Sequence, residues 1–268
     1  MKLASLAAAE EMAGAVGRWA LARLHRLAGQ AGFAGRLLSL SRRPFQVLLL
    51  RMALEEVFKL VRGALPLTLM VGFIMGAAWA FIWLRPLAYL GGGLDTVTSV
   101  LITVNSLLLA PVFVSVIVIF GYGVSTIWDL AVMKATGQFE TLTRLGVPPE
   151  HFLALPRIAA TLVALPPLLA VFTLVSFVGA YLMVWQYTGH SVLAFIVSLS
   201  DNARALHFVT ISLKSLGLSL ALSFFTVYGG FQVETDGLDR GSDILSQALA
   251  EAFFFSILSS LLVSAFLR

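Results

Sequence analysis

The chain has 268 residues, of which 59% are apolar and only 12% are charged, and its mean hydropathy is +0.93. Soluble domains average roughly 45–50% apolar and about 25% charged residues, so this composition excludes an ordinary soluble protein and predicts several membrane spans. Cysteine is absent, which excludes disulfide and thiol chemistry. The net charge of +4 fits contact with anionic lipid headgroups, and we infer no nucleic-acid partner from it.

The first 62 residues form a basic region ahead of the first apolar block. They hold ten of the eighteen Lys and Arg residues but only four acids, which predicts a cytoplasmic N-terminus. Between residues 44 and 62, apolar and charged residues interleave. This pattern predicts either an in-plane helix that leads into the membrane or an inward extension of the first span. Glu55 and Lys59, four residues apart, are expected to form an ion pair on this helix.

Five apolar blocks follow, at residues 63–90, 97–132, 158–187, 208–231 and 244–267. Each is long enough for the roughly 20 residues that a helix needs to cross a bilayer core of about 30 Å. The sequence therefore predicts an all-α membrane protein with five spans, whose termini lie on opposite sides of the membrane. Gly72 and Gly76 lie four residues apart in the first block, a spacing that favours close packing of helices.

A polar segment at residues 134–157 separates the second and third blocks, and its position between two spans predicts that it lies in the cytoplasm. Its apolar residues recur every third position, which is typical of a short amphipathic helix. Gly146 is expected to end that helix, because a Pro-Pro pair soon follows. On pattern alone, the helix either docks a partner or rests on lipid headgroups. The apolar residues in question are Phe139, Leu142 and Leu145.

Few residues in the chain carry recognisable chemistry. No phosphate-binding loop or nucleophile elbow is present, and the four histidines are too dispersed for a metal signature, so we expect no catalytic site, no metal site and no enzyme activity. Asp129, near the cytoplasmic end of the second block, is expected to form a structural ion pair with Lys134 rather than to relay protons. Lys214 is expected to extend its ammonium group toward the membrane surface.

Motifs at particular spacings suggest a family. They are Leu109-Ala110-Pro111, the sequence MKATGQ at residues 133–138, Pro156-Arg157, Lys214-Ser215 and Tyr228-Gly229-Gly230-Phe231. Together they resemble the permease subunit of MCE-type lipid ABC transporters, the MlaE/YrbE family, over residues 63–266. The resemblance implies five spans, an in-plane N-terminal (elbow) helix and a cytoplasmic coupling helix between the second and third spans. Residues 1–62 would form a cytoplasmic or interfacial N-terminal region, and residues 63–268 the five-span permease domain.

The resemblance also implies a function and partners. The protein would move phospholipid or another hydrophobic lipid between membranes, from a place in the bacterial inner (cytoplasmic) membrane with its C-terminus in the periplasm. ATP and Mg would be bound by a separate ABC ATPase subunit, and this chain would hold no cofactor. A periplasmic MCE-domain protein and a second permease protomer, identical or paralogous, would complete the complex.

Two groups of residues receive roles from the resemblance. One group, in the coupling segment 134–157, would contact the ATPase: Gln138, Phe139, Leu142, Arg144, Leu145 and Gly146. The other would line a lipid cavity: Trp83, Leu87, Asn105 and Leu108.

The chain departs from the family pattern in the cavity. Leu107 and Leu108 stand where the family has Arg-Glu, which leaves Asn105 as the remaining polar group on that stretch. One explanation is a substrate with a different head group, and another is that the chain is the less active half of a heterodimer. A membrane scaffold that transports nothing is the competing function.

Overall fold

The computed structural model describes residues 28–36, 47–89, 92–203, 205–232 and 238–266. The chain divides into two compact units, Met1–Phe45 and Gln46–Arg268. The described part of the first unit is a helix over residues 28–36. The second unit contains all the long apolar helices, and one of them runs through residue 62.

That helix, α2 (Val47–Tyr89), continues without a break through Gly63 and contains Pro66 and Pro86. Of the two arrangements that the sequence allowed for residues 44–62, the inward extension of the first span is the one observed for the described part. At 1.5 Å per residue, α2 is about 64 Å long, roughly twice the thickness of a bilayer core. Its exposed ion pair joins Glu55 to Arg51 at 3.4 Å, not to Lys59 as expected.

The second span alternates α-helix and π-helix from residue 94 to residue 135. Its parts are α3 (Leu94–Val100), η1 (Leu101–Leu109), α4 (Ala110–Val118), η2 (Ile119–Gly123) and α5 (Val124–Ala135). In η1 the wider turn is visible in the bond from the Ala110 N–H to the Asn105 carbonyl, five residues back. Segments of π-helix inside longer helices frequently mark functional positions.

The rest of the chain adds three more spans and three short helices. They are α6 (Gln138–Arg144), η3 (Glu150–Ala154), α7 (Leu155–Thr188), α8 (Val192–Asn202), α9 (Ala205–Gln232) and α10 (Leu238–Phe266). The described residues contain no strand and five helical segments long and apolar enough to cross a membrane. The prediction of an all-α membrane protein with five spans is confirmed.

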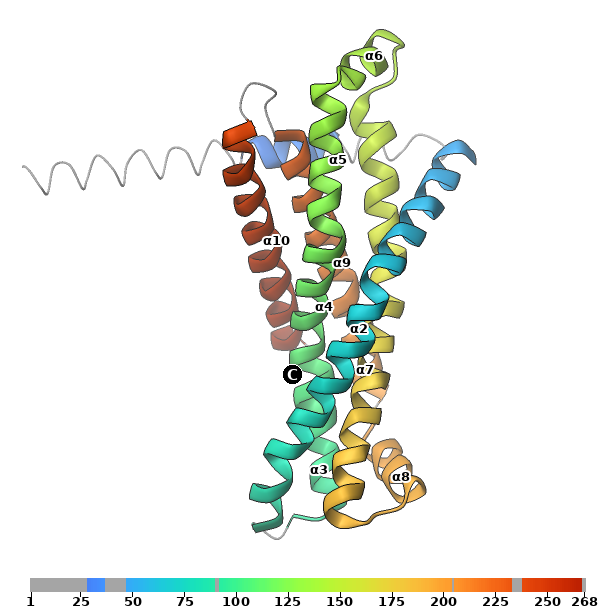
Figure 1. Ribbon diagram of the computed structural model, residues 1–268, viewed down its shortest axis with the longest axis vertical. Helices are drawn as coiled ribbons and strands as arrows, with labels where there is room; N and C mark the ends of the chain where they lie inside the picture. Colours follow the sequence, from blue (N-terminus) through green and yellow to red (C-terminus); the bar gives the residue numbers. More distant parts are fainter. Residues whose placement is uncertain (1–27, 37–46, 90–91, 204, 233–237, 267–268) are drawn as a thin grey trace, which may run out of the picture. The chain divides into compact units, whose positions relative to one another are not determined.

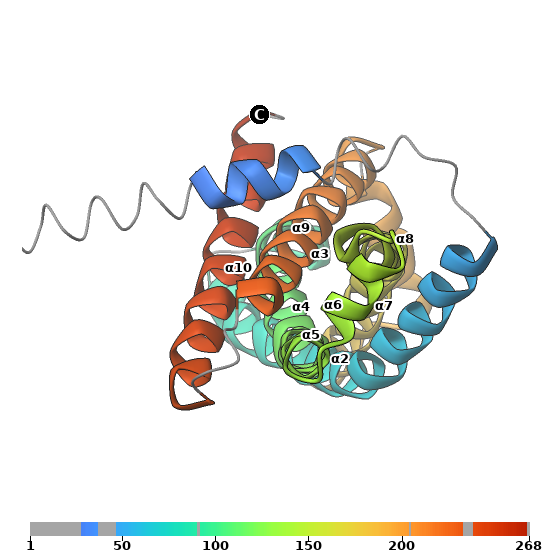
Figure 2. The ribbon, with the colours of Figure 1, turned by 90° about the horizontal axis from the view of Figure 1, so that it is seen from above.

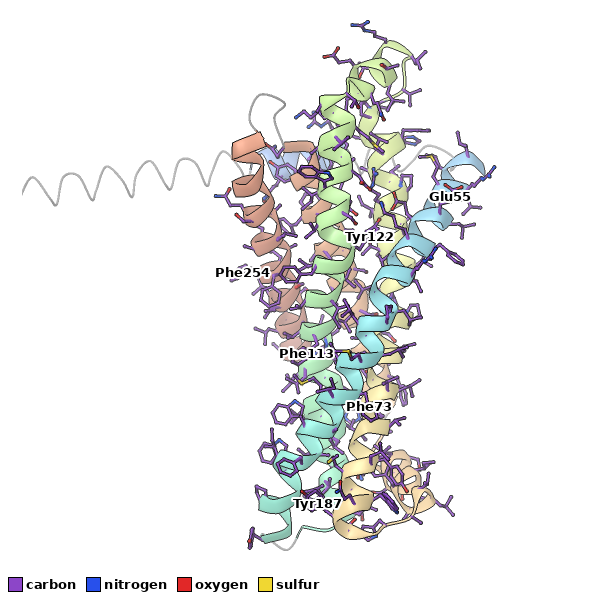
Figure 3. All side chains as sticks on the ribbon, in the orientation of Figure 1. Glu55, Phe73, Phe113, Tyr122, Tyr187 and Phe254 are labelled. Atoms are coloured by element: carbon purple, nitrogen blue, oxygen red, sulfur yellow. The ribbon has the colours of Figure 1, made fainter. Side chains whose placement is uncertain are left out.

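The spans of the second unit form a bundle with two different ends. The helix α6 lies at one end, and α3 and α8 lie at the other (Figure 1). Helix α7 packs against both α2 and α9, and α9 packs against α10. Seen along the helices, the N-terminal part of α2 lies on the side of the bundle opposite α10 (Figure 2). Labelled side chains mark the ends: Tyr122 and Glu55 lie toward the α6 end, and Tyr187 toward the other (Figure 3).

The backbones of α2 and α7 touch where they cross. A Cβ atom added to Gly76 would lie 1.8 Å from the Ser176 carbonyl oxygen, and one added to Gly179 would lie 2.2 Å from the Phe73 carbonyl oxygen. At Gly72 the corresponding distance to the Phe172 carbonyl oxygen is 3.1 Å. Only a residue without a side chain fits at Gly76, so the close packing expected from the Gly72 and Gly76 spacing is confirmed.

Two apolar clusters fill the bundle. The larger one joins α2, α4, η2, α7, α9 and α10 around Phe172, and the smaller one lies at the α8 end around Val184 and Phe195. Hydrogen bonds hold α8 against α3: Ser198 Oγ donates to Asp95 Oδ1 at 2.6 Å, and Asn202 Nδ2 donates to Thr98 Oγ1 at 3.1 Å. Burial of apolar side chains in these clusters orients the spans around one another.

Candidate functional site

The polar segment between the second and third spans is built around α6. Gly137 precedes the helix with φ of 73°, and Gly146 follows it with φ of 76°, a conformation that glycine adopts without strain. The Gly146 N–H bonds to the Thr143 carbonyl at 3.0 Å, and the Val147 N–H bonds to the Leu142 carbonyl at 3.0 Å. This pair of bonds is the Schellman arrangement, so the prediction that Gly146 ends the helix is confirmed.

The six residues proposed to contact an ATPase differ in exposure. Leu145 is 73% exposed although it is apolar, whereas Phe139 and Leu142 are half-buried. Phe139 packs its ring against Phe231 at the end of α9, with 5.0 Å between ring centroids. Three others lie on the surface: Gln138, Arg144 and Gly146. Four of the six residues are therefore exposed to solvent, and Phe139 packs α6 against the end of α9.

A groove of about 680 Å³ runs beside α6. Aromatic rings and prolines form its apolar part, and charged side chains of α6 and η3 also line it. Arg144 and Glu140, at 3.8 Å, form an exposed pair in which neither charge is buried. An apolar groove with a charged rim suits contact with another protein. The lining residues are Phe139, Glu140, Thr143, Arg144, Pro148, Pro149, Glu150 and Phe231.

The expected ion pair between Asp129 and Lys134 is replaced by two separate interactions. Asp129 pairs with Lys59 of α2, and Lys134 Nζ donates a hydrogen bond of 2.9 Å to the Phe231 carbonyl. Five residues on an α-helix correspond to about 140° of rotation, so Asp129 and Lys134 point to different neighbours. Lys134 places its positive charge at the C-terminal end of α9, where the helix dipole favours a cation.

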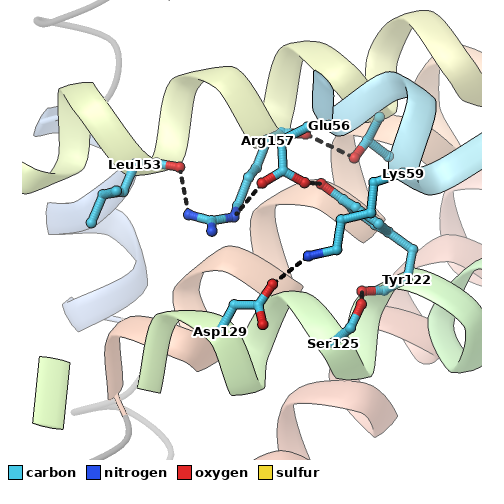
Figure 4. A network of polar contacts seen from close by, with 8 residues as sticks. Glu56, Lys59, Tyr122, Ser125, Asp129, Leu153 and Arg157 are labelled. Carbon is cyan, nitrogen blue, oxygen red and sulfur yellow. Dashed lines mark hydrogen bonds and ion pairs between the residues drawn. The ribbon is translucent and has the colours of Figure 1, made fainter. Parts of the chain in front are cut away.

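A network of polar side chains lies toward the α6 end of the bundle (Figure 4). Glu56 of α2 is its centre: Oε1 lies 3.4 Å from Nε of Arg157, and Oε2 accepts a hydrogen bond of 3.1 Å from the Tyr122 hydroxyl. Arg157 is only 5% exposed and also donates from Nη1 to the Leu153 carbonyl at 3.1 Å. The sequence pattern placed Glu56 on a surface helix and gave no reason to join it to Tyr122.

A second polar cluster lies within the spans, where η1 meets α7 and α9. Asn105 is 1% exposed, and its Nδ2 donates to Ser176 Oγ. The Asn105 side-chain oxygen and the Ser106 hydroxyl are buried without a hydrogen-bond partner. Lys214 is also 1% exposed and donates to the Leu107 carbonyl, so its side chain does not extend to the membrane surface as expected. The prediction failed because a carbonyl of the π-helical segment accepts the ammonium group in the interior.

The four residues proposed to line a lipid cavity occupy different surroundings. Asn105 is buried, whereas Leu108 is 47% exposed on the outside of the bundle. Trp83 packs with Trp79 beside the α8 end, and its indole nitrogen is buried without a hydrogen-bond partner. Leu87 belongs to α2, but its side chain lies outside the described part. Among these residues, only Asn105 belongs to the buried polar cluster.

Ionisable side chains of the described residues form no group that suits a metal ion. No three of their His, Cys, Asp or Glu residues cluster at metal-binding distance. The charged groups near α6 instead join helices to one another in pairs.

Comparisons with known proteins give a consistent result. The family model described as Permease MlaE matches residues 53–268. The chain is similar to a probable ABC transporter permease protein of Rickettsia typhi and to another of Rickettsia prowazekii, at 23% identity over 172 residues in each case. A third such protein, of Rickettsia felis, is 24% identical. The alignments cover 63% of this chain and 64% of the relatives, so the chain spans just under two thirds of their length.

Proposed function

This chain belongs to the MlaE permease family, and from that premise we propose that it is the membrane-spanning permease subunit of an ABC transporter. A separate ATPase subunit would dock on α6 and supply the energy of ATP hydrolysis, with ATP and Mg bound in that subunit. The cargo would be a phospholipid or another hydrophobic lipid. The α6 end would face the cytoplasm of a bacterium, with the chain in the inner membrane and its C-terminus in the periplasm.

One observation carries the proposal: a short, exposed helix is suspended between two spans. Helix α6 follows α5 after only Thr136 and Gly137, and it leads through η3 into α7. A force on α6 therefore acts on both spans at once, which is the requirement for driving a conformational change from outside the membrane. Beside the exposed Leu145, an apolar groove with a charged rim follows the same segment, a combination that suits a protein partner.

Support for a lipid cargo comes from the side chains of the spans. The described part of the spans has few buried ionisable groups, with Lys214 the clearest example, and no chain of carboxylates or histidines from which to build a proton relay. An apolar cargo needs no such relay. The MCE-domain partner and the second protomer, identical or paralogous, follow from the family resemblance alone and belong to the same proposal.

Substitution of the exposed leucine on α6 tests the proposal. Leu145→Asp places a charge on the surface that would contact the ATPase, and the double variant Leu142→Asp with Leu145→Asp extends the change to a half-buried position. Co-purification of the ATPase subunit should fall at least tenfold, because an unpaired charge in an apolar contact costs about 2 kcal/mol or more. Leu193→Asp is the matched control, since Leu193 is 71% exposed at the opposite end of the bundle.

The outcome depends on how much ATPase co-purifies with the Leu145→Asp variant and with the Leu193→Asp control. Retention of the ATPase by the Leu145→Asp variant at the level of the native chain would argue against α6 as the docking element. Loss of the ATPase from the Leu193→Asp variant as well would point to general misfolding, which size-exclusion chromatography of both variants detects.

A membrane scaffold, or the inactive half of a heterodimeric permease, is the second candidate. Leu107 and Leu108 favour it, because they stand where the resembled family has a polar pair. ATP-dependent movement of a fluorescent phospholipid by proteoliposomes that contain this chain as the only permease would exclude this candidate. Movement that requires a second, different permease chain would support it.

A further inference from the structure

The carboxylate of Glu56 joins three helices near the α6 end. Its two oxygens face different partners: Oε1 faces Arg157 in the first turn of α7, and Oε2 accepts from Tyr122 of η2. Tyr122 is 3% exposed and Arg157 is 5% exposed, so water competes little for either contact. One side chain of α2 therefore holds both the second and the third span (Figure 4).

A second connection lies one turn farther along α2. Lys59 is three residues after Glu56 and therefore on the same face of the helix. It pairs with Asp129 of α5, and Asp129 is two turns after Tyr122. Because α2 runs away from the α6 end and the second span runs toward it, the two connections cross, and together they tie two levels of α2 to two levels of the second span.

These connections reach both attachments of α6. Helix α5, which carries Asp129, ends two residues before α6 begins, and α7, which carries Arg157, follows η3 on the other side. Any displacement of α6 that moves α5 and α7 is therefore passed to the α6 end of α2 through Lys59 and Glu56.

The glycine crossing supplies a pivot for α2. The backbones of α2 and α7 are in contact at Gly76 and Ser176 and again at Phe73 and Gly179. Along α2, Gly76 lies about 30 Å from Glu56 and about 20 Å from Tyr89, at 1.5 Å per residue. No side chain separates the two backbones at this point, so the crossing holds α2 and α7 at a fixed distance while side chains on either side of it can shift.

Stability alone is a poor explanation for these charges. A buried ion pair contributes little more to stability than apolar side chains of similar volume, and often less, because desolvation offsets the attraction. A better-supported role for such a pair is to fix the relative orientation of the helices that it joins. Glu56 and Arg157 meet this description, since they join helices that are far apart in the sequence.

We propose that Glu56, Lys59, Tyr122, Asp129 and Arg157 form a joint that turns α2 about the Gly76 crossing when α6 is displaced. These are positioning residues, and none of them needs to contact the ATPase or the cargo. The inference rests on the proposed function, because it requires an ATPase that moves α6. Its consequence is a movement of the far end of α2, near Tyr89, relative to α8.

A distance measurement in the assembled complex tests this movement. Because this chain has no cysteine, Tyr89→Cys and Leu193→Cys introduce the only two sites for spin labels within it, at side chains that are 88% and 71% exposed, and the partner subunits are used in cysteine-free form. Double electron–electron resonance on the complex with its ATPase subunit, in lipid nanodiscs, compares the nucleotide-free state with the ADP-vanadate state. We expect the distance between the labels to change by about 2 Å or more.

Variants of the joint should suppress the change. Glu56→Gln keeps an acceptor for Tyr122 but removes the charge that faces Arg157, and it should at least halve the nucleotide-driven shift. Arg157→Gln should do the same, whereas Arg157→Lys, which keeps the charge, should restore the shift. Glu55→Gln is the matched control, because Glu55 is adjacent on α2 but faces solvent and pairs only with exposed Arg51 among the pairs described.

Two further measurements separate positioning from stability and from docking. The double variant Glu56→Gln with Arg157→Gln leaves no unpaired buried charge, so its thermal midpoint should differ from that of Glu55→Gln by less than about 4 °C while its nucleotide-driven shift stays at half or less of the native one. Both variants should bind the ATPase subunit as well as the native chain. A larger drop in the midpoint, in proportion to the lost shift, would mean that Glu56 acts only by stabilising the fold, and the inference would fail.

Each remaining outcome is also decisive. If Glu56→Gln and Glu55→Gln show the same shift as the native chain, the joint is not required and the inference fails, while the proposed function stands. If the native complex binds ATPase and nucleotide without any shift, α2 does not turn and the inference fails again. If no ATPase binds the native chain, the proposed function itself fails.

Discussion

At the scale of single residues, the less exposed ionisable side chains near α6 pair across helices, whereas the exposed pairs Arg51–Glu55 and Glu140–Arg144 form within one helix. Asp129 pairs with Lys59, seventy positions earlier in the chain, and Glu56 pairs with Arg157 of α7. Lys214 follows the same rule inside the bundle, where it donates to the Leu107 carbonyl. Local spacing predicted Asp129 with Lys134 and Glu55 with Lys59, and neither pair is observed: Asp129 and Lys59 pair with each other across helices, and Glu55 pairs with Arg51 on its own helix.

The choice of partner for Asp129 leads to a prediction about stability. A double-mutant cycle with Lys59→Met and Asp129→Asn should show a coupling energy of up to about 1 kcal/mol, since both side chains are partly exposed. A cycle with Lys134→Met and Asp129→Asn should be additive within about 0.3 kcal/mol. Unfolding of the purified chain in detergent micelles measures both cycles, and a larger coupling in the second one would contradict the observed pairing.

At the scale of elements, two features determine how the helices can move. The second span contains the π-helical segments η1 and η2, which supply the Leu107 carbonyl for Lys214 and the Tyr122 hydroxyl for Glu56. The crossing of α2 and α7 brings backbone against backbone at Gly76. Regular α-helix in the second span would place these groups at different angles, and a side chain at Gly76 would separate the helices.

Substitution of Gly76 therefore has a strong expected effect. Gly76→Val puts three carbon atoms where a single Cβ would lie 1.8 Å from the Ser176 carbonyl oxygen, so we expect destabilisation of about 3 kcal/mol or more. Gly72→Ala should cost less, because its Cβ would lie 3.1 Å from the Phe172 carbonyl oxygen. Gly93→Ala, with nothing within 4 Å, is the control and should be close to neutral. Equal thermal midpoints for the Gly76 and Gly93 variants would refute the close crossing.

At the scale of the whole molecule, the five spans separate an end that carries α6 from an end that carries α3 and α8 (Figure 1). The basic residues of the N-terminal region favour a cytoplasmic N-terminus, and five spans then place the C-terminus on the opposite side. The groove beside α6 and the joint below it lie together at the same end, which is where an external force would act.

This topology gives a prediction that needs no partner protein. In intact cells, a membrane-impermeant maleimide should label the Leu193→Cys variant but should label the Leu145→Cys variant only after the cells are opened. The two positions are similarly exposed, at 71% and 73%, so a difference in labelling reports the side of the membrane. The cysteine-free native chain is the blank. Labelling of Leu145→Cys in intact cells would reverse the proposed orientation.

The amino-acid sequence by itself determined the number of spans, the approximate ends of the last four, the capped helix α6 and the close packing at Gly76. Each of these depends on local composition or spacing: apolar runs of bilayer length, a glycine that accepts positive φ, and glycines four residues apart. Only the tertiary structure decided which charges pair, because Glu56, Tyr122 and Arg157 come from three segments whose contact depends on how helices cross. Contacts between side chains of different helices depend on how the helices pack. The close crossing at Gly76 positions α2 so that Glu56 meets Tyr122 and Arg157.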